Sequence, residues 1–245
     1  IRSKITPPMP VAAFKVPHPA GDIPAKAYLT QIDSLPVYLI EGAPIPVDAP
    51  VYSTNTRQDG EKYGFFSLSA LELARALDWQ PDILHANDWH TAIAVHKLSL
   101  IQKQDPFFAR TRSILSVHNL PFMGAGIEQV VTSFGFPQGT DPRLPEWARS
   151  FPLPLGLLAA DQIIAVSPNY GREILTPAFG CGLQDMLRTR ADSICGILNG
   201  LDQNVWNPLT DPHLTHNFSI QTLAERAQNK TRLQADLGLP VDPSI

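Results

Sequence analysis

The sequence predicts an α/β fold in which a parallel sheet is covered by helices on both faces. Short apolar runs at residues 82–86, 113–117, 162–166 and 193–198 have the length and composition of buried strands. Stretches with a helical period lie between them, and polar residues follow each run directly. Alternation of brief apolar strands with helices is typical of βαβ units, so we expect these four strands to lie parallel in one sheet.

The spacing of apolar residues predicts helices over residues 63–79, 89–101, 153–160, 168–175 and 183–191. The first of these has a wide apolar face that includes Phe65, Leu68 and Leu71. A final amphipathic helix is expected over residues 221–237, where Gly238 and then Pro240 would end it.

The first 50 residues have a different character, because they contain ten of the 24 prolines. Proline removes a backbone donor and fixes φ, so long helices are excluded there. β-prone runs survive between the prolines at residues 11–16, 26–31 and 37–41. These are expected to be strands or extended segments joined by turns.

Composition excludes several classes of function. The chain is 44% hydrophobic and 17% charged, with a net charge of −4 and no basic stripe of the kind that binds nucleic acid. No apolar stretch reaches the roughly 18–20 residues that a membrane span requires, so the cytoplasm is the expected location, or the plastid in a plant. Cys181 and Cys195 are too few for a disulfide scaffold and are expected to be reduced, buried thiols.

Polar residues gather after each of the four predicted strands, at residues 85–90, 118–126, 167–170 and 199–202. In doubly wound sheets, ligands bind in the crevice outside the carboxyl ends of the strands. Four strand ends that all carry polar groups are more than folding requires. The sequence therefore predicts a binding site along this edge of the sheet.

The segment from His85 to His90 is the most concentrated of the four. Its two histidines, five residues apart, do not stack on a helix face, so a zinc site is not predicted. The alternative is structural: Asp88 would cap the next helix, Trp89 would pack, and the histidines would bond to backbone. Spacing alone does not decide between this role and a functional one.

Other patterns are weaker. Gly124-x-Gly126 and Gly180-x-Gly182 lack the third glycine of a dinucleotide fingerprint and are expected to form turns. Ser167 precedes a proline and lacks the Gly-x-Ser-x-Gly elbow of a serine hydrolase. Asp59 would by default be a solvated carboxylate before the first long helix.

Five ordered motifs resemble the bacterial glycogen synthases and plant starch synthases, over about residues 36–240. The first two are His-Ala-Asn-Asp-Trp-His at 85–90 and Ser-Val-His-Asn-Leu at 116–120. Ala-Val-Ser-Pro-Asn-Tyr at 165–170 and Thr-Pro-Ala-Phe-Gly-Cys-Gly-Leu at 176–183 follow. Gly-Ile-Leu-Asn-Gly-Leu-Asp at 196–202, with Trp-Asn-Pro at 206–208, completes the series.

The resemblance implies a Rossmann-like N-terminal domain of a two-domain, B-type glycosyltransferase. Its activity would be α-1,4-glucosyl transfer from ADP-glucose or UDP-glucose to a glucan with retention at the sugar, without a metal or other cofactor. By position, His90 and Asp59 match catalytic residues, and His118, Asn119 and Asn199 match substrate-binding ones. Asp59 lies in Asp-Gly-Glu-Lys-Tyr, whereas the family has Asp-Asn-x-Arg-Phe, so Gly60 and Lys62 depart from that pattern.

The resemblance also implies a domain organisation. Residues 1–240 would be the N-terminal, sugar-side domain without its first strand, glycine-rich donor loop and helix, and residues 241–245 would begin the linker. The C-terminal domain, a partner that binds the nucleotide, would be absent, so these 245 residues are expected to transfer no glucose alone. Alternatives are a non-catalytic glucan-binding or regulatory module, and a related transferase that uses another sugar.

Overall fold

The computed structural model describes residues 5–48 and 50–245 and contains two compact units. The first ends at Leu198, and the second extends from Asn199 to Ile245. Among the described residues, no helix is both long and apolar enough to cross a membrane.

The first unit contains the predicted parallel sheet. Its strand order is β4-β5-β6-β7, and all three neighbouring pairs are parallel, as the alternation of strands and helices predicted. The strands are β4 (Ile83–Asn87), β5 (Arg112–Val117), β6 (Gln162–Ala165) and β7 (Ile194–Gly196). Because strand order follows chain order, the carboxyl ends of β4 and β5 are neighbours at one edge of the sheet.

Helices of the first unit lie at the five predicted places, although several are shorter or longer than expected; α3 and the 3₁₀ turns were not predicted. In the first unit they are α1 (Thr56–Ala76), α2 (Asp88–Ile101), α3 (Glu128–Ser133), α4 (Pro152–Ala159), α5 (Pro168–Glu173) and α6 (Gln184–Arg188), with 3₁₀ turns at Glu146–Ser150 and Ala191–Ser193. Helix α1 begins at Thr56, not Tyr63, because Asn55 caps it. The Asn55 Oδ1 accepts the backbone N–H groups of Arg57 and Gln58 at 3.1 and 3.3 Å. Asp59 is therefore inside the helix, and its assignment to a preceding loop was wrong.

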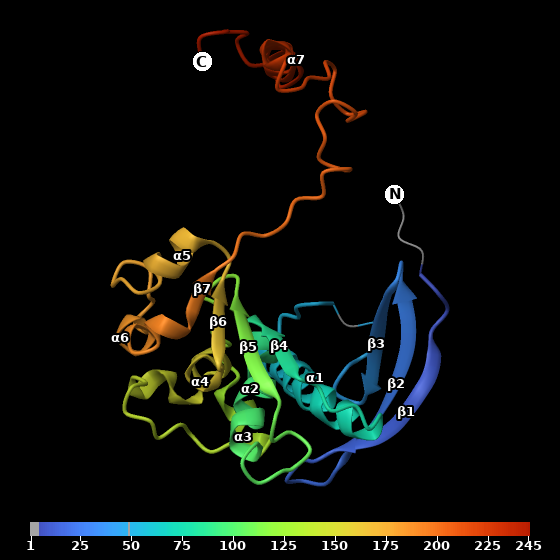
Figure 1. Cartoon of the computed structure of the whole chain (residues 1–245), viewed down its shortest axis with the longest axis vertical. Helices are drawn as coiled ribbons and strands as arrows, with labels where there is room; N and C mark the ends of the chain where they lie inside the picture. The colour runs from blue at the N-terminus through green and yellow to red at the C-terminus, as the bar shows by residue number, and fades with distance from the viewer. Residues whose placement is uncertain (1–4, 49) are drawn as a thin grey trace. The chain divides into compact units, whose positions relative to one another are not determined.

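The proline-rich start forms an antiparallel meander of β1 (Met9–Val16), β2 (Ile23–Ile32) and β3 (Leu35–Gly42). The three expected strands are confirmed, and Pro10 lies at an irregularity in the register of the outer strand β1, where proline is tolerated. Helix α1 lies between this meander and the parallel sheet (Figure 1).

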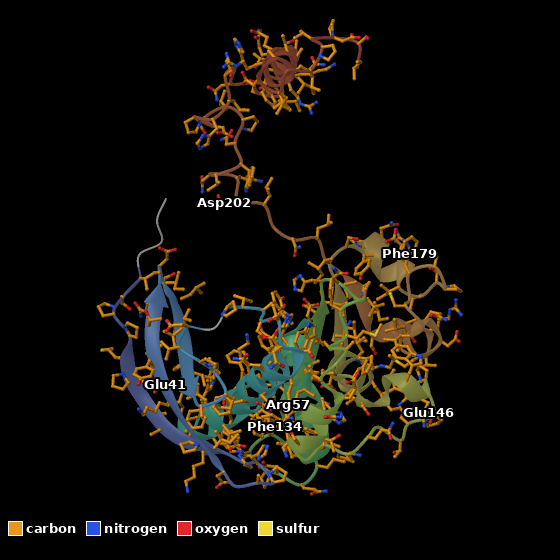
Figure 2. All side chains as sticks on the ribbon, turned by 180° about the vertical axis from the view of Figure 1, so that it is seen from behind. Glu41, Arg57, Phe134, Glu146, Phe179 and Asp202 are labelled. Carbon is orange, nitrogen blue, oxygen red and sulfur yellow. The ribbon has the colours of Figure 1, made fainter. Side chains whose placement is uncertain are left out.

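The core of the first unit consists of one large cluster of buried apolar residues and a smaller one around Leu71, Leu98 and Phe108. Phe65 of α1 is fully buried, as is Leu115 of β5. Helices α2 and α4 approach closely at Gly156, where an added Cβ would lie 2.7 Å from the Cβ of Ala92. Phe134 packs against α1 at Gly64 and against the ring of His18, and Figure 2 labels it in the side-chain-filled region between the two sheets.

Two charged side chains form hydrogen bonds between neighbouring elements of the first unit. The Asp161 carboxylate accepts the backbone N–H of Ser113 at 2.7 Å, which links β6 to β5. The Arg190 guanidinium donates to the carbonyls of Leu157 (3.1 Å), Leu158 (2.6 Å) and Ala160, the carboxyl end of α4. These carbonyls have no hydrogen-bond partner within the helix, and the Arg190 guanidinium provides one. Burial lowers the pKa of Arg190.

Both cysteines are free thiols, but the expectation that they are buried was wrong. Cys181 and Cys195 are exposed. Cys181 has φ +51° in a tight turn between two glycines, and this conformation directs it away from the core. Neither residue contributes to packing as a small apolar side chain would.

The second unit has one α-helix, α7 (Arg226–Asp236), preceded by a 3₁₀ turn at Leu223–Glu225. The predicted helix over 221–237 is thus confirmed from Arg226 to Asp236, whereas residues 221–225 are not α-helical. Gly238, with φ +66°, ends it as the sequence indicated. Asn229 holds the preceding segment by accepting the N–H of His216 at 3.0 Å and donating to its carbonyl at 2.7 Å.

We expect Arg190→Met to lower the free energy of unfolding by about 2–4 kcal/mol, because methionine keeps the apolar stem but leaves the carbonyls at the end of α4 without a donor. Urea denaturation of the chain measures the change. Arg57→Met is the matched control, since Arg57 forms an exposed ion pair with Glu61 worth at most about 1 kcal/mol. Equal stability of Arg190→Met and the wild type would contradict the capping role.

Candidate functional site

A pocket of about 480 Å³ lies where the carboxyl ends of β4 and β5 meet the start of α1. Its size is in the range of small-molecule sites. Its wall combines carboxylate, amide, imidazole and aromatic groups. The lining residues are Tyr52, Ser53, Thr56, Asp59, Asp88, Trp89, His90, Asn119, Phe122, Gly124, Ala125 and Ile127.

Asp88 joins the two strand ends that form the floor of this site. Its backbone has φ +52°, a left-handed conformation that is uncommon for residues other than glycine. Its Oδ1 accepts the backbone N–H of His118 at 2.8 Å. The expectation that Asp88 caps α2 was wrong, because its carboxylate reaches the next strand instead. Asn87 occupies the N-cap position without a side-chain bond to the helix.

The other histidines of these motifs bond to side chains rather than to backbone. His85 Nε2 lies 2.7 Å from the Ser116 hydroxyl on the neighbouring strand. His118 Nε2 lies 3.0 Å from Asn87 Oδ1. His85 thus links β4 to β5, and His118 supports the same junction from the side of β5.

His90 has a different environment, because aromatic rings surround it. Its ring centroid lies 4.1 Å from that of Trp89, 4.6 Å from Tyr63 and 5.5 Å from Tyr52. Its Nε2 is buried without a hydrogen-bond partner in the described structure. Burial lowers the pKa of His90, so the ring is neutral at pH 7. A neutral imidazole with an unused nitrogen can accept or donate one hydrogen bond to a ligand.

Asp59 is buried and paired, so its default role as a solvated carboxylate was wrong. It accepts the backbone N–H of Ser53 at 2.9 and 3.1 Å through its two oxygens. Its Oδ1 also forms an ion pair with the buried Lys62 ammonium at 3.1 Å. The pair neutralises two charges that could not be buried separately.

The loop after β5 covers the pocket from the other side. Gly124 and Gly126 have φ +83° and +86°, which confirms that they are turn glycines. An added Cβ at Gly124 would lie 2.9 Å from Pro152 and 3.2 Å from Trp89, so only glycine fits there. Within the same loop, the Leu120 N–H donates to the Tyr170 hydroxyl at 2.9 Å, which joins the third polar segment to the second.

The pocket brings together three of the five predicted site residues, Asp59, His90 and Asn119. His118 lies beside the lining and bonds to Asn87. Asn199 begins the second unit, so its relation to the pocket stays a prediction. Tyr52 and Phe122 also line the pocket and were not predicted, because loop aromatics carry no periodic signal.

The described residues, 5–48 and 50–245, contain no group of three or more His, Cys, Asp or Glu side chains placed to hold a metal ion.

Comparison with known proteins gives consistent matches. A family model for the starch synthase catalytic domain matches residues 4–189. The glycogen synthase of Aromatoleum aromaticum is 40% identical over 227 residues, 91% of this chain and 44% of that protein. Glycogen synthase 2 of Geobacter sulfurreducens is 35% identical over 227 residues, 90% of this chain and 47% of that protein.

A solved structure agrees with these matches. The catalytic domain of Starch Synthase IV from Arabidopsis thaliana, bound to ADP and acarbose, matches with a TM-score of 0.77 and 25% identity. The match covers 98% of this chain and 50% of that one. The chain thus spans about half the length of the relatives it matches.

We expect the Asp59–Lys62 pair to show strong coupling in a double-mutant cycle. Asp59→Asn leaves a buried ammonium without its counter-charge and should cost about 3 kcal/mol of stability. Lys62→Met should cost a similar amount, because it leaves the carboxylate unpaired. The double variant buries no charge, so its loss should be smaller than the sum by about 2 kcal/mol. Urea denaturation of the four proteins measures this, and additive losses would contradict a buried ion pair.

Proposed function

The chain belongs to the starch synthase catalytic-domain family, and from this we propose that it supplies the sugar-side wall of a retaining glucosyltransferase. The reaction would move glucose from ADP-glucose or UDP-glucose to the non-reducing end of an α-1,4-glucan. The family match over residues 4–189 supports this proposal, as does the likeness to a starch synthase domain that was solved with ADP and acarbose.

The observation that carries the proposal is the unpartnered Nε2 of His90 at a pocket that also contains Asn119. In the transfer, the bond between the sugar C1 and the phosphate oxygen breaks, and the nucleotide diphosphate leaves with the electron pair. The acceptor 4-hydroxyl forms the new bond to C1, and its proton passes to the departing diphosphate. A fixed imidazole beside the sugar can bond to one of the sugar hydroxyls. This hydrogen bond becomes stronger as charge develops on the sugar ring in the transition state.

The neighbouring groups would orient the same sugar. The Asn119 side chain offers both a donor and an acceptor for hydroxyls. We propose that Asn199 bonds to a further sugar hydroxyl and that His118 binds the substrate beside Asn119. The aromatic rings around His90 exclude water from its buried nitrogen, which strengthens any bond it makes.

The partners of the whole protein are part of the proposal. We propose a nucleotide-sugar donor, an α-glucan acceptor and a second domain that binds the nucleotide, with a cytoplasmic location. The alternative, a non-catalytic glucan-binding module, predicts glucan binding without release of nucleotide diphosphate. Incubation of the whole protein with ADP-glucose, or UDP-glucose, and glycogen separates the two, because only the transferase releases the diphosphate.

In the whole protein, we expect His90→Ala to lower kcat by roughly 10²–10³-fold and to change donor affinity little. The reason is that the bond from His90 strengthens mainly in the transition state. Measurement of kcat, donor Kd and thermal stability on one preparation tests this. His85→Ala is the matched control, since His85 links two strands outside the pocket and should lower Tm with near-normal turnover. A His90→Ala variant within a few-fold of wild-type kcat would end the catalytic role.

The pH profile gives a second test of His90. Burial lowers its pKa below the usual value near 6.5, so the ring should stay neutral as pH falls through that value. The limb of log kcat that depends on His90 should therefore lie below pH 6.5 in the wild type and be absent in His90→Ala. A limb above pH 6.5 that disappears in His90→Ala would contradict the neutral-ring model.

A further inference from the structure

The loop after β5 is held by the segments that follow both neighbouring strands. Strand β5 lies between β4 and β6, and the three strands are parallel, so their chains leave the sheet at the same edge. From the side of β4, the Asp88 Oδ1 accepts the backbone N–H of His118 at 2.8 Å. From the side of β6, the Tyr170 hydroxyl accepts the backbone N–H of Leu120 at 2.9 Å. The two bonds thus hold the residues directly before and after Asn119.

Asn119 brings a polar side chain from this loop to the pocket, whereas Phe122, Ala125 and Ile127 bring apolar ones. Asn119 is exposed, although Leu120 beside it is fully buried. The Asn119 carbonyl accepts the N–H of Phe122 at 3.2 Å, so the loop turns at this point. The direction of the Asn119 amide therefore depends on how the peptide units on its two sides are held.

The start of α5 fixes the position of Tyr170. The Ser167 Oγ accepts the backbone N–H of Tyr170 at 2.8 Å and so caps the helix. Gly196 of β7 allows this start to lie close to the sheet, since an added Cβ would overlap with Pro168 and with the Ser167 carbonyl. Burial raises the pKa of Tyr170, so its hydroxyl stays protonated at neutral pH. Tyr170 thus offers a neutral oxygen at a defined place beside the next loop.

Without the Tyr170 hydroxyl, a buried backbone donor would lose its partner. Because Leu120 is fully buried, its N–H cannot turn to bulk water where it lies. A buried donor without a partner is costly, so the peptide unit would shift until it finds a new one. Asn119 shares that peptide unit and would move with it. A small displacement of a group that orients the substrate is enough to slow a reaction.

We propose that Tyr170 is a positioning residue for glucosyl transfer. Together with Asp88, it holds the peptide units on both sides of Asn119 and so fixes the amide that bonds to the transferred glucose. This inference rests on the proposed function. Tyr170 is not one of the described residues that line the pocket, and its hydroxyl bonds to backbone, so it acts through Asn119 and not on the substrate.

The first experiment compares two hydroxyl deletions in the whole protein, with saturating nucleotide sugar and glycogen. Tyr170→Phe keeps the ring and should lower kcat roughly three- to tenfold, the scale of one lost hydrogen bond, with little change in donor Kd. Thr111→Val is the matched control. The Thr111 hydroxyl also bonds to backbone, at 2.7 Å from the Pro81 carbonyl, but it lies before β5 at the opposite end of the strand. Thr111→Val should lower Tm and leave kcat unchanged, when both are assayed well below Tm.

The second experiment asks through which residue Tyr170 acts. In an Asn119→Ala background, Tyr170→Phe should have no further effect on kcat, because the side chain that it positions is gone. In a Phe122→Ala background the full effect of Tyr170→Phe should remain, since Phe122 belongs to the same loop but is not the residue positioned. A merely structural role would instead lower Tm in all backgrounds and change kcat by the same factor in each, or not at all.

The outcomes separate this inference from the proposed function. A wild-type protein that releases no diphosphate from either nucleotide sugar would overturn the proposed function, and the inference with it. Transfer by the wild type together with a Tyr170→Phe kcat within about twofold of wild type would overturn the inference alone. A fall in kcat that persists in the Asn119→Ala background, or an equal fall in Thr111→Val, would also overturn it.

Discussion

The contact on which the site depends is the hydrogen bond from the His118 backbone to the Asp88 carboxylate. A parallel sheet brings the ends of β4 and β5 side by side, but it does not fix the direction in which each chain leaves. Asp88 sets both directions at once, because its left-handed backbone turns the chain into α2 while its side chain holds the next strand end. The positions of His90 and Asn119 follow from this junction. Strain at a non-glycine left-handed residue of about 1 kcal/mol or more is offset by this charge-assisted bond.

A second constraint comes from α1. Asp59 and Lys62 lie three residues apart, so they share one face of the helix and can pair. Either side chain alone would place an unpaired charge in this buried position, which is costly. Because the two occur together, the helix can bury a polar turn against the loop at residues 50–53 and still leave backbone groups satisfied. The buried pair therefore specifies the loop conformation, because both of its members also bond to the loop backbone.

The sequence predicted the repetitive parts of the fold well, since the four apolar runs and the helical periods depend on local patterning. It was less successful for features that depend on contacts between distant segments of the chain. Asn55 could not be chosen as the cap from Ser-Thr-Asn-Thr, where several residues are able to cap, so the start of α1 and the burial of Asp59 were missed. Capping of α2 by Asp88, one of two alternatives that the sequence left open, was wrong because the partner of its carboxylate lies 30 residues away. Cys181 was expected in the core, although its turn between two glycines leaves it exposed.

The two kinds of site residue differ in how they could be found. His90 and Asn119 follow strand ends, and such positions are visible in a pattern of short apolar runs with polar residues after them. Tyr52 and Phe122 lie on loops, whose positions are set by tertiary bonds such as those from Lys62. A sequence shows the residues that the sheet edge brings together, but it shows the loop residues only after the anchors of each loop are known. The polar residues of the pocket can thus be predicted from the pattern of strands in the sequence. Its aromatic residues cannot, because their positions depend on the hydrogen bonds that hold the loops.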